Sequence, residues 1–351
     1  MTIREHFQNR EKSFIAKYGC LSNETKGRSK KEDPCPIRTP FQIDRDRIVY
    51  SNAFRRLKHK TQVFLAPLGD HYRTRLTHTL EVAEIARTIA RAMRLNEDLT
   101  EAVALGHDLG HTPFGHGGEA ALKEIFSSSF AHNKQSLRVV EILENKGKGL
   151  NLTYEVKDGI VKHSKGGYGS IIPKTSEETA VTVEGHIGRI ADIMAYLNHD
   201  LDDAIRSGVI TQNEIPDFCN KILGTSHSER ITSMIRDLIY TSKLENDKFC
   251  LILSKDLSEA MHLLRRFLYD NVYRSPVVHN EFIKAKKIIT GLYTYLLKDK
   301  DEFRKVANEL ELNLCPDCNP DERCVADIIA SMTDQYALNL YKKLFFPSSI
   351  V

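Results

Sequence analysis

The helical spacing of apolar residues is the feature that most restricts the fold of this chain. In residues 185–205, GHIGRIADIMAYLNHDLDDAI, apolar side chains recur every three or four positions. On a helical wheel they share one side: Ile187, Ile190, Met194, Leu197, Leu201 and Ile205. Residues 81–93, EVAEIARTIARAM, carry a similar stripe. This spacing is typical of amphipathic α-helices. Because it dominates the chain, we expect an all-α fold with room for one short hairpin.

Local signals place several helix boundaries. Asn96 is a good N-cap, and the acidic residues that follow it suit a first helical turn. We expect this helix to run into His107 and the next helix to begin near Glu119, because glycines and a proline interrupt the pattern between them. Residues 151–163, NLTYEVKDGIVKH, alternate like a strand at their start but fit a short helix equally well.

Two polar segments divide the chain. Residues 20–37 are charged and proline-punctuated, and residues 164–182, SKGGYGSIIPKTSEETAVT, are the strongest loop signal in the sequence. We expect residues 1–36 to form an N-terminal helix and a polar arm. Residues 37–351 then form the main domain with a helical C-terminal extension.

Composition excludes several classes of protein. The 351 residues are 41% hydrophobic and 28% charged, and the formal net charge of +3 is too small for a nucleic-acid coat. Basic residues cluster only locally, in RDRIVYSNAFRRLKHK at 45–60 and in a shorter run at 26–31. No apolar run approaches a membrane span, and the N-terminus lacks a signal-peptide pattern. Seven cysteines, an odd number, do not suggest a disulfide framework. We expect a cytoplasmic protein with no membrane partner.

The chemistry concentrates in residues 107–119, HDLGHTPFGHGGE. Three histidines and two carboxylates within thirteen positions suit a divalent metal of moderate hardness. His107 and His111 would share a face if the helix continued through them. His107 and Asp108 point about 100° apart around a helix, so the remaining ligands must come from elsewhere. His78 and Asp192 are the candidates.

Asp192 lies on the side of the 185–205 helix opposite to the apolar stripe. Tyr196, His199 and Asp203 share that side, with Asp200 at its edge. From the wheel alone, the favoured interpretation is that this polar side faces water. A functional role for the polar side of this helix needs evidence other than helical periodicity.

That evidence is a resemblance to the HD-domain phosphohydrolases, and within them to the deoxyguanosine triphosphate triphosphohydrolase branch. The matching pattern is His78, His107-Asp108 and Asp192, in that order. The longer matching stretches run from about residue 37 to 346: RTPFQIDRDRIVYSNAFRRLKHKTQVF, HYRTRLTHTLEVAEIARTIAR, LGHDLGHTPFGHGGEAAL, HNKQSLRVVE, ADIMAYLNHDLDDAI and MTDQYALNLYKKLF. The His-Asp dipeptide alone is weak evidence, but the ordered series is specific. The fold that it implies is the HD-domain helical fold with additional helices.

The resemblance implies one divalent ion per site, Mn²⁺, Mg²⁺ or Fe²⁺, held by His78, His107, Asp108 and Asp192. It implies attack of water on the α-phosphorus of a deoxynucleoside triphosphate, with dGTP favoured, which releases the deoxynucleoside and tripolyphosphate. The phosphate-binding GxxxxGK[ST] loop of enzymes that act on the terminal phosphate is absent from the sequence, in agreement.

Further roles follow from the same resemblance. His116 would transfer the proton and Glu119 would orient it, with the order of transfer to water and to the leaving oxygen left open. His111 matches a position near the phosphates. The positions that match substrate contacts are Gln62 beside the sugar and base, Arg75 at a phosphate, Asn133 in the pocket lining together with Gln135, Tyr196 against the deoxyribose and Asp200 at the 3′-hydroxyl.

Relatives of this kind form symmetric oligomers, commonly tetramers or hexamers, and many respond to nucleotides at subunit contacts. A homo-oligomer with a dNTP effector or single-stranded DNA as partner is therefore expected. Two alternatives stay open. One is an HD phosphohydrolase acting on another nucleotide, such as a 5′-mononucleotide. The other is a nucleotide-sensing or nucleic-acid-sensing protein with a vestigial HD site, which the intact ligand pattern disfavours.

One motif lies outside this resemblance. Cys315 and Cys318 have the CxxC spacing of a zinc site, with Cys324 nearby, but the segment offers no obvious local fourth ligand. Free intracellular cysteines are the favoured interpretation.

Overall fold

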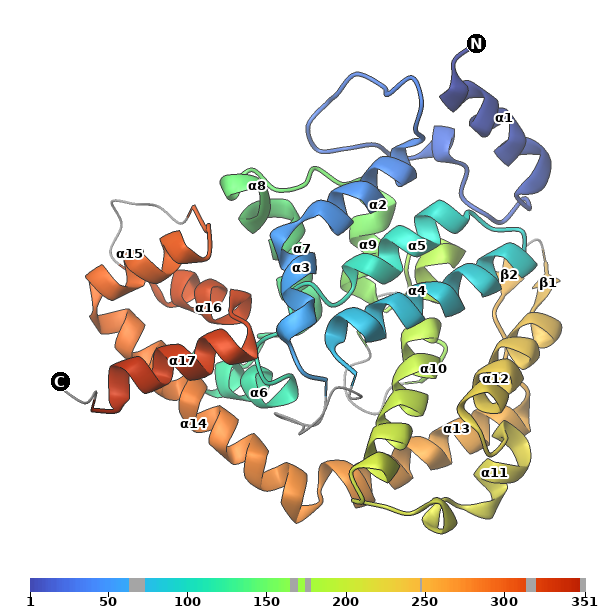
Figure 1. The fold of residues 1–351 in the computed structure, drawn as a ribbon. Helices are drawn as coiled ribbons and strands as arrows, with labels where there is room; N and C mark the ends of the chain where they lie inside the picture. The colour runs from blue at the N-terminus through green and yellow to red at the C-terminus, as the bar shows by residue number, and fades with distance from the viewer. Residues whose placement is uncertain (63–72, 165–169, 174–177, 247, 314–319, 348–351) are drawn as a thin grey trace. The chain divides into compact units, whose positions relative to one another are not determined.

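The computed structural model describes residues 1–62, 73–164, 170–173, 178–246, 248–313 and 320–347, and helices are the dominant secondary structure of these ranges (Figure 1). One antiparallel hairpin accompanies the helices: β1 (Lys243–Glu245) pairs with β2 (Lys248–Cys250). The all-α expectation with one short hairpin is confirmed. No helix within the described ranges is long and apolar enough to cross a bilayer.

The chain divides into two compact units, and each is described by itself. Unit 1 comprises residues 1–49, 78–107 and 151–275, and unit 2 comprises residues 50–77, 108–150 and 276–351. The division at residue 37 expected from the sequence stays a prediction.

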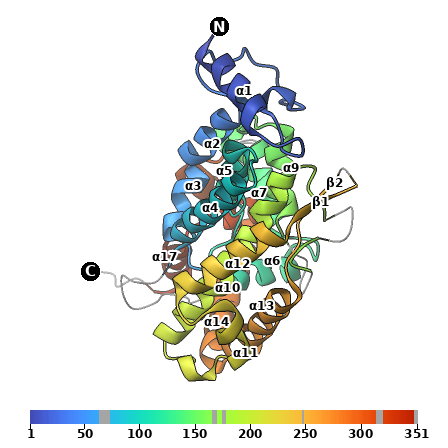
Figure 2. The same ribbon diagram turned by 90° about the vertical axis from the view of Figure 1, so that its right-hand side faces the viewer.

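Among the described residues, unit 1 contains seven α-helices wholly and two in part. They are α1 (Ile3–Phe14), most of α2 (Pro40–Tyr50), all but the first turn of α4 (Arg75–Ala92), α5 (Glu97–Gly106), α9 (Tyr154–Lys162), α10 (Val183–Arg206), α11 (Asp217–Leu223), α12 (His227–Thr241) and α13 (Lys255–Leu268) with its π-helical continuation η5 (Tyr269–Tyr273). As expected, the Asn96 side chain caps α5 by accepting from the Leu99 N–H. Figure 2 shows α10 beside α12 and α13, which contact it.

Glycines allow α5, α9 and α10 to pack closely. A Cβ at Gly159 in α9 would lie 2.6 Å from Val103 Cγ2 of α5, and a Cβ at Gly188 in α10 would lie 2.8 Å from Val103 Cγ1. Both distances are shorter than real carbon contacts allow, so only glycine fits at this crossing. The segment 151–163, which the sequence left open, is helical from Tyr154, and Val156, Gly159 and Ile160 are buried.

Unit 2 is built around the 23-residue helix α14 (Pro276–Lys298), which contacts α6, α15, α16 and α17. Its elements are α3 (Asn52–Arg56), α6 (His116–Ile125), α7 (His132–Arg138), α8 (Glu144–Gly147), α14, α15 (Lys300–Glu309), α16 (Glu322–Ser331) and α17 (Asp334–Phe345). Buried carboxylates tie these elements together. Asp334, at the start of α17, accepts from the backbone N–H groups of Thr61 and Phe114 at 2.9 Å each.

The stretch between α5 and α6 differs from the sequence expectation. The helix ends at Gly106 and α6 begins at His116, three residues before Glu119, so His107 and His111 do not share a helical face. Close backbone approach explains the break, because a Cβ at Gly110 would lie 2.1 Å from the Ser136 nitrogen of α7. Gly115 has φ +53, a left-handed conformation that favours glycine.

Two other sequence expectations fall partly or wholly outside the described residues. The loop 164–182 is described only at residues 164, 170–173 and 178–182. Cys315 and Cys318 lie outside the described ranges, and Cys324 is a free, half-buried cysteine at the start of α16.

Candidate metal centre and catalytic residues

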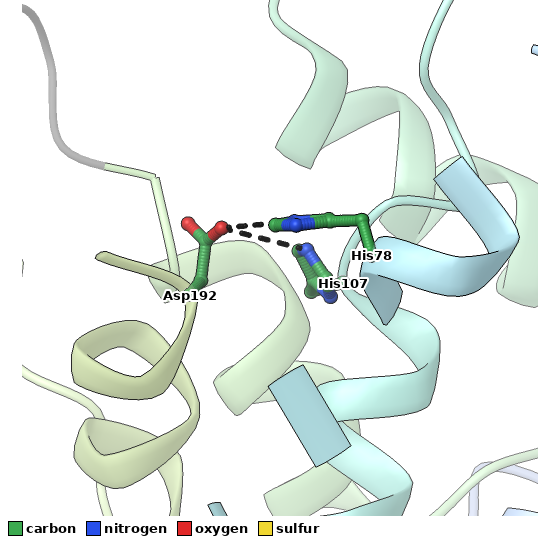
Figure 3. A group of neighbouring side chains, drawn as sticks. All are labelled: His78, His107 and Asp192. Atoms are coloured by element: carbon green, nitrogen blue, oxygen red, sulfur yellow. Dashed lines mark ion pairs between the residues drawn. The ribbon is translucent and has the colours of Figure 1, made fainter. Parts of the chain in front are cut away.

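Three of the predicted metal ligands lie together in unit 1. His78 comes from α4, His107 directly follows α5, and Asp192 comes from α10. Asp192 Oδ1 lies 3.3 Å from His78 Nε2 and 3.9 Å from His107 Nε2. Figure 3 shows the three side chains pointing toward one another. One ligand atom from each residue falls within 4.8 Å of the others. Two imidazole nitrogens and a carboxylate oxygen converging in this way could hold a divalent cation.

Hydrogen bonds orient both imidazoles for this purpose. His107 Nδ1 lies 2.6 Å from the carbonyl oxygen of Ala104, which can only accept, so Nδ1 carries the proton and Nε2 keeps its lone pair. His78 Nδ1 lies 3.0 Å from His199 Nδ1. Both ring positions are almost fully buried, whereas the Asp192 side chain is 14% exposed. The donor set thus fits a metal ion approached from the Asp192 side.

The fourth predicted ligand, Asp108, belongs to unit 2 although it directly follows His107 in the chain. Its carboxylate accepts from Arg75 Nη1 at 2.6 Å and lies 3.6 Å from His111 Nε2. Arg75, predicted to hold a phosphate, therefore lies beside a predicted metal ligand. The ligand role of Asp108 stays a prediction.

Unit 2 gathers a second group of histidines around Glu119. His111 stacks on His132 with ring centroids 4.3 Å apart. Glu119 Oε2 lies 3.0 Å from His132 Nδ1 and 3.8 Å from His116 Nδ1, and Glu119 Oε1 pairs with Lys123 at 2.8 Å. The His116 side chain is 69% exposed, while Glu119 is buried. A solvent-accessible imidazole beside a buried carboxylate is suited to proton transfer.

The charge states in this group follow from its surroundings. Burial alone would raise the pKa of Glu119, but the neighbouring His116 and His132 hold that pKa well below its usual value. Burial, together with the Arg75 cation, lowers the pKa of His111 well below its ordinary value. Glu119 is therefore an anion and His111 a neutral imidazole at neutral pH.

Two residues of this group escaped the sequence reasoning. His132 is the first residue of the matching stretch HNKQSLRVVE and of α7. No motif or spacing in the neighbouring sequence marks it as a site residue in preference to Asn133, which follows it. Lys60 is fully buried and donates to the carbonyl oxygens of His111 and Ala330. Burial lowers the pKa of Lys60 to about 7. Its only sequence signal is its place in a basic cluster.

Two of the predicted contacts of unit 2, Gln62 and Arg75, lie near the Gly115 turn. A Cβ at Gly115 would lie 2.7 Å from the Gln62 carbonyl oxygen and 3.1 Å from Arg75 Nη2. Gln62 is buried there. Gln135 has a structural partner, because its Nε2 donates to the buried Asp327 of α16 at 2.9 Å.

The predicted sugar-binding residues lie one helical turn apart on α10, in unit 1. Asp200 is buried and accepts from the Tyr273 hydroxyl of η5. Tyr196 is hydrogen-bonded to Arg265 of α13, and burial raises its pKa. Neither Tyr273 nor Arg265 could be found from sequence, since each lies more than sixty residues from its partner on α10.

The wheel interpretation that this side of α10 faces water is wrong. His199 is completely buried, and Asp200 and Asp203 are 4% and 5% exposed. The side is polar because it faces other polar side chains of the protein, and a wheel cannot distinguish such an interior from solvent.

Comparison with known proteins identifies the class of protein that has this arrangement of residues. A sequence model of the HD domain matches residues 75–197, which include all four predicted metal ligands, and one described as "Phosphohydrolase-associated domain" matches residues 251–343. The class that the helical fold and the His–His–Asp centre define is therefore the HD domain.

Full-length relatives narrow the class. A "Deoxyguanosinetriphosphate triphosphohydrolase-like protein" from Desulfatibacillum aliphaticivorans is 62% identical over 100% of both chains. Proteins of the same description from Caldanaerobacter subterraneus (99% of this chain, 97% of the relative) and Clostridium perfringens (100% of both) are 51% and 43% identical. The chain belongs to this family of deoxyguanosinetriphosphate triphosphohydrolase-like proteins and is a hydrolase. A solved hypothetical protein from Aquifex aeolicus, matched over 87% of this chain and 68% of its own, is 20% identical with TM-score 0.47.

Proposed function

We propose that this enzyme hydrolyses deoxynucleoside triphosphates, dGTP above others, to the deoxynucleoside and inorganic tripolyphosphate by attack of water on the α-phosphorus. The observation that carries the proposal is the convergence of His78 Nε2, His107 Nε2 and Asp192 Oδ1. The names of full-length relatives support the substrate class.

The resemblance adds Asp108 to these three residues as the fourth ligand. A bound divalent ion would polarise a phosphate oxygen and lower the pKa of a water molecule. Mn²⁺ and Fe²⁺ suit a site of two imidazoles and two carboxylates better than Mg²⁺, which prefers oxygen ligands throughout.

In this proposal His116 moves the proton and Glu119 orients His116. The 5′-oxygen of a nucleoside is a poor leaving group unless it is protonated, so a general acid is needed near it. The ionised Glu119 lies 3.8 Å from His116 Nδ1 and can orient that imidazole, and the exposure of His116 gives substrate access to it. The neutral His111 can donate a hydrogen bond without adding charge, while Arg75 supplies a cation for the phosphates.

Tyr196 and Asp200 would select the sugar. The buried Asp200 carboxylate can accept a hydrogen bond from a 3′-hydroxyl in addition to the one from Tyr273. The tyrosine ring one turn away would crowd C2′, where a ribonucleotide carries its extra hydroxyl. A shaped site that reads one hydroxyl and excludes another can discriminate strongly.

The proposal also includes regulation by a second ligand. It further includes assembly into a tetramer or hexamer. Most cations of segment 45–60 already have partners: Arg45 pairs with Asp98 at 3.1 Å, Arg47 with Glu32 at 2.7 Å and Arg56 with Glu144 at 3.4 Å. The exposed Arg55 and Lys58 are the cations of this segment best placed to meet a dNTP effector or single-stranded DNA.

The decisive experiment is ion-exchange analysis of the products from each dNTP, with Mn²⁺ and separately with Mg²⁺. Equimolar deoxynucleoside and tripolyphosphate would support the proposal. Orthophosphate as the initial product would contradict attack at the α-phosphorus. Pyrophosphate together with the deoxynucleoside monophosphate would contradict cleavage of the bond to the 5′-oxygen. Preferential hydrolysis of a 5′-mononucleotide would favour the other HD phosphohydrolase function, and no product from any nucleotide would favour a sensing role.

A further inference from the structure

A second cluster of ionisable side chains adjoins the predicted metal centre within unit 1. It consists of Glu81 on α4, His199 on α10 and His227 at the start of α12. Glu81 follows His78 by three residues and His199 follows Asp192 by seven, so each lies on the helical face of the predicted ligand before it. The facing helices α4 and α10 thus bring together two pairs of functional groups.

These groups form a continuous chain of contacts. His78 Nε2 faces Asp192 Oδ1 at 3.3 Å, and His78 Nδ1 lies 3.0 Å from His199 Nδ1. On its far side, His199 Nε2 pairs with the Glu81 carboxylate. His199 is completely buried, whereas the Glu81 side chain is 38% exposed. The chain therefore runs from the metal centre through a buried imidazole to a carboxylate at the surface.

Hydrogen-bond chemistry permits only one arrangement of protons when His78 binds a metal. A metal-binding Nε2 must be unprotonated, so Nδ1 of His78 carries the hydrogen and donates it. Nδ1 of His199 must then accept, which leaves the hydrogen of His199 on Nε2. A carboxylate is an acceptor only, and the Glu81 carboxylate is the ion-pair partner of this nitrogen.

We infer that His199 and Glu81 are positioning residues that fix the proton of His78 on Nδ1 and hold its Nε2 toward the metal. This inference rests on the proposed function, since it takes His78 as a ligand. A ligating histidine whose other nitrogen is held by a hydrogen-bond partner is oriented and more basic. The ionised end of the chain strengthens the effect, because hydrogen bonds to a carboxylate are stronger than neutral ones.

The same cluster could alternatively be considered a second cation site, but the proton arrangement opposes it. A cation held by Glu81, His199 and His227 would need an unprotonated Nε2 on His199. The hydrogen of His199 would then lie on Nδ1 and donate to His78 Nδ1, which would force the hydrogen of His78 onto Nε2. That nitrogen could no longer bind a metal, so the two sites exclude each other. His227 has its own partner, since its Nδ1 lies 2.7 Å from Asp202 Oδ2.

The test is the affinity of the nucleotide-free protein for Mn²⁺, measured from the electron paramagnetic resonance signal of the free ion. Glu81→Ala should weaken binding by about 10–100-fold, the usual loss when a partner of a ligand is removed. Glu81→Gln should weaken it less, because the amide oxygen still accepts from His199. His199→Leu should weaken it at least as much as Glu81→Ala, and His199→Gln should recover part of the loss.

His227→Ala is the matched control, because His227 belongs to the cluster and stacks on His199 at 5.8 Å but lies outside the proton chain. It should bind Mn²⁺ like the wild type. Loss of one of two bound ions in His227→Ala would overturn the inference in favour of the second cation site, and wild-type affinity in Glu81→Ala would overturn it outright.

Two further measurements keep these results interpretable. Thermal unfolding of each metal-free variant identifies a folding defect, and Glu81, which is only half-buried, provides a variant outside the hydrophobic core. In the Zn²⁺-loaded wild type, ¹⁵N spectra of the imidazoles should show His78 protonated at Nδ1 and His199 at Nε2, and the reverse would refute the chain. If Mn²⁺ binds as described but no triphosphate is cleaved, the proposed function fails while the positioning roles stand.

Discussion

The crossing of α5 and α10 sets the geometry of the metal centre, and Gly188→Ala tests this link. Val103 of α5 precedes His107 by one turn, and Gly188 of α10 precedes Asp192 by one turn. A Cβ at Gly188 would lie 2.8 Å from Val103 Cγ1, against about 3.5–4.0 Å for carbon atoms at their best separation. The substitution must therefore move the helices apart by about 0.7–1.2 Å, or distort one of them, one turn before both ligands.

The effect on stability should be small and the effect on metal binding large. Overpacking of this kind costs about 1–3 kcal/mol. Alanine is favoured over glycine inside a helix by about 1 kcal/mol, which leaves a net destabilisation of about 0–2 kcal/mol. Metal–ligand distances tolerate only about 0.2 Å, far less than the required displacement. The Mn²⁺ dissociation constant should rise by about tenfold or more.

The assay combines Mn²⁺ titration and thermal unfolding for the wild type, Gly188→Ala, Val103→Ala and the double variant. Because Val103→Ala removes the methyl group that the new Cβ would meet, it should restore Mn²⁺ affinity in the Gly188→Ala background. The reasoning is refuted if Gly188→Ala binds Mn²⁺ like the wild type, or if its loss of affinity persists in the double variant.

Three further predictions concern catalysis, sugar selection and pH. His116→Ala should lower kcat for dGTP by about 10²–10⁴-fold while keeping wild-type Mn²⁺ affinity, and stoichiometric loss of the metal would instead make His116 a ligand. Tyr196→Ala should reduce the preference for dGTP over GTP, measured as the ratio of their kcat/KM values. If the wild type has similar kcat/KM values for both nucleotides, Tyr196 does not exclude the 2′-hydroxyl. Lys60 has a folded-state pKa near 7, below its unfolded value of 10.5, so the unfolded state binds more protons between these pH values and stability should rise with pH from about 7. Lys60→Met should flatten that rise in denaturant unfolding at pH 7 and pH 9, and an equal slope in both proteins would contradict the assignment.

Much of the fold could be predicted because helices leave a periodic record in the sequence. The stripe from Ile187 to Ile205 and the cap at Asn96 both correspond to helices in the structure. The end of α5 at Gly106 could not be predicted, because it depends on how closely Gly110 meets the backbone of α7, some 25 residues later. Close approach between distant segments leaves no local pattern.

The candidate site was predictable only where the pattern of a known family carried it. His78, His107 and Asp192 were found through family resemblance, and the structure brings them together. His132, Lys60 and the Glu81–His199 pair were missed, because each is defined by a partner on another helix. The buried polar side of α10 has the same cause: periodicity separates two faces of a helix but cannot tell what each face meets.

Because α10 carries a proposed metal ligand and both proposed sugar-binding residues, the length of this helix restricts which mutations the site can accept. Asp192, Tyr196 and Asp200 are spaced by four residues each, which separates successive side chains by about 6 Å along the axis and 40° around it. One inserted or deleted residue after Asp192 would rotate everything beyond it by about 100° and turn Tyr196 and Asp200 away from the ligand. The proposed sugar selection can therefore be altered by substitutions on this helix but not by inserting or deleting single residues. Asp192, Tyr196 and Asp200 keep their relative positions only while the number of residues between them is unchanged.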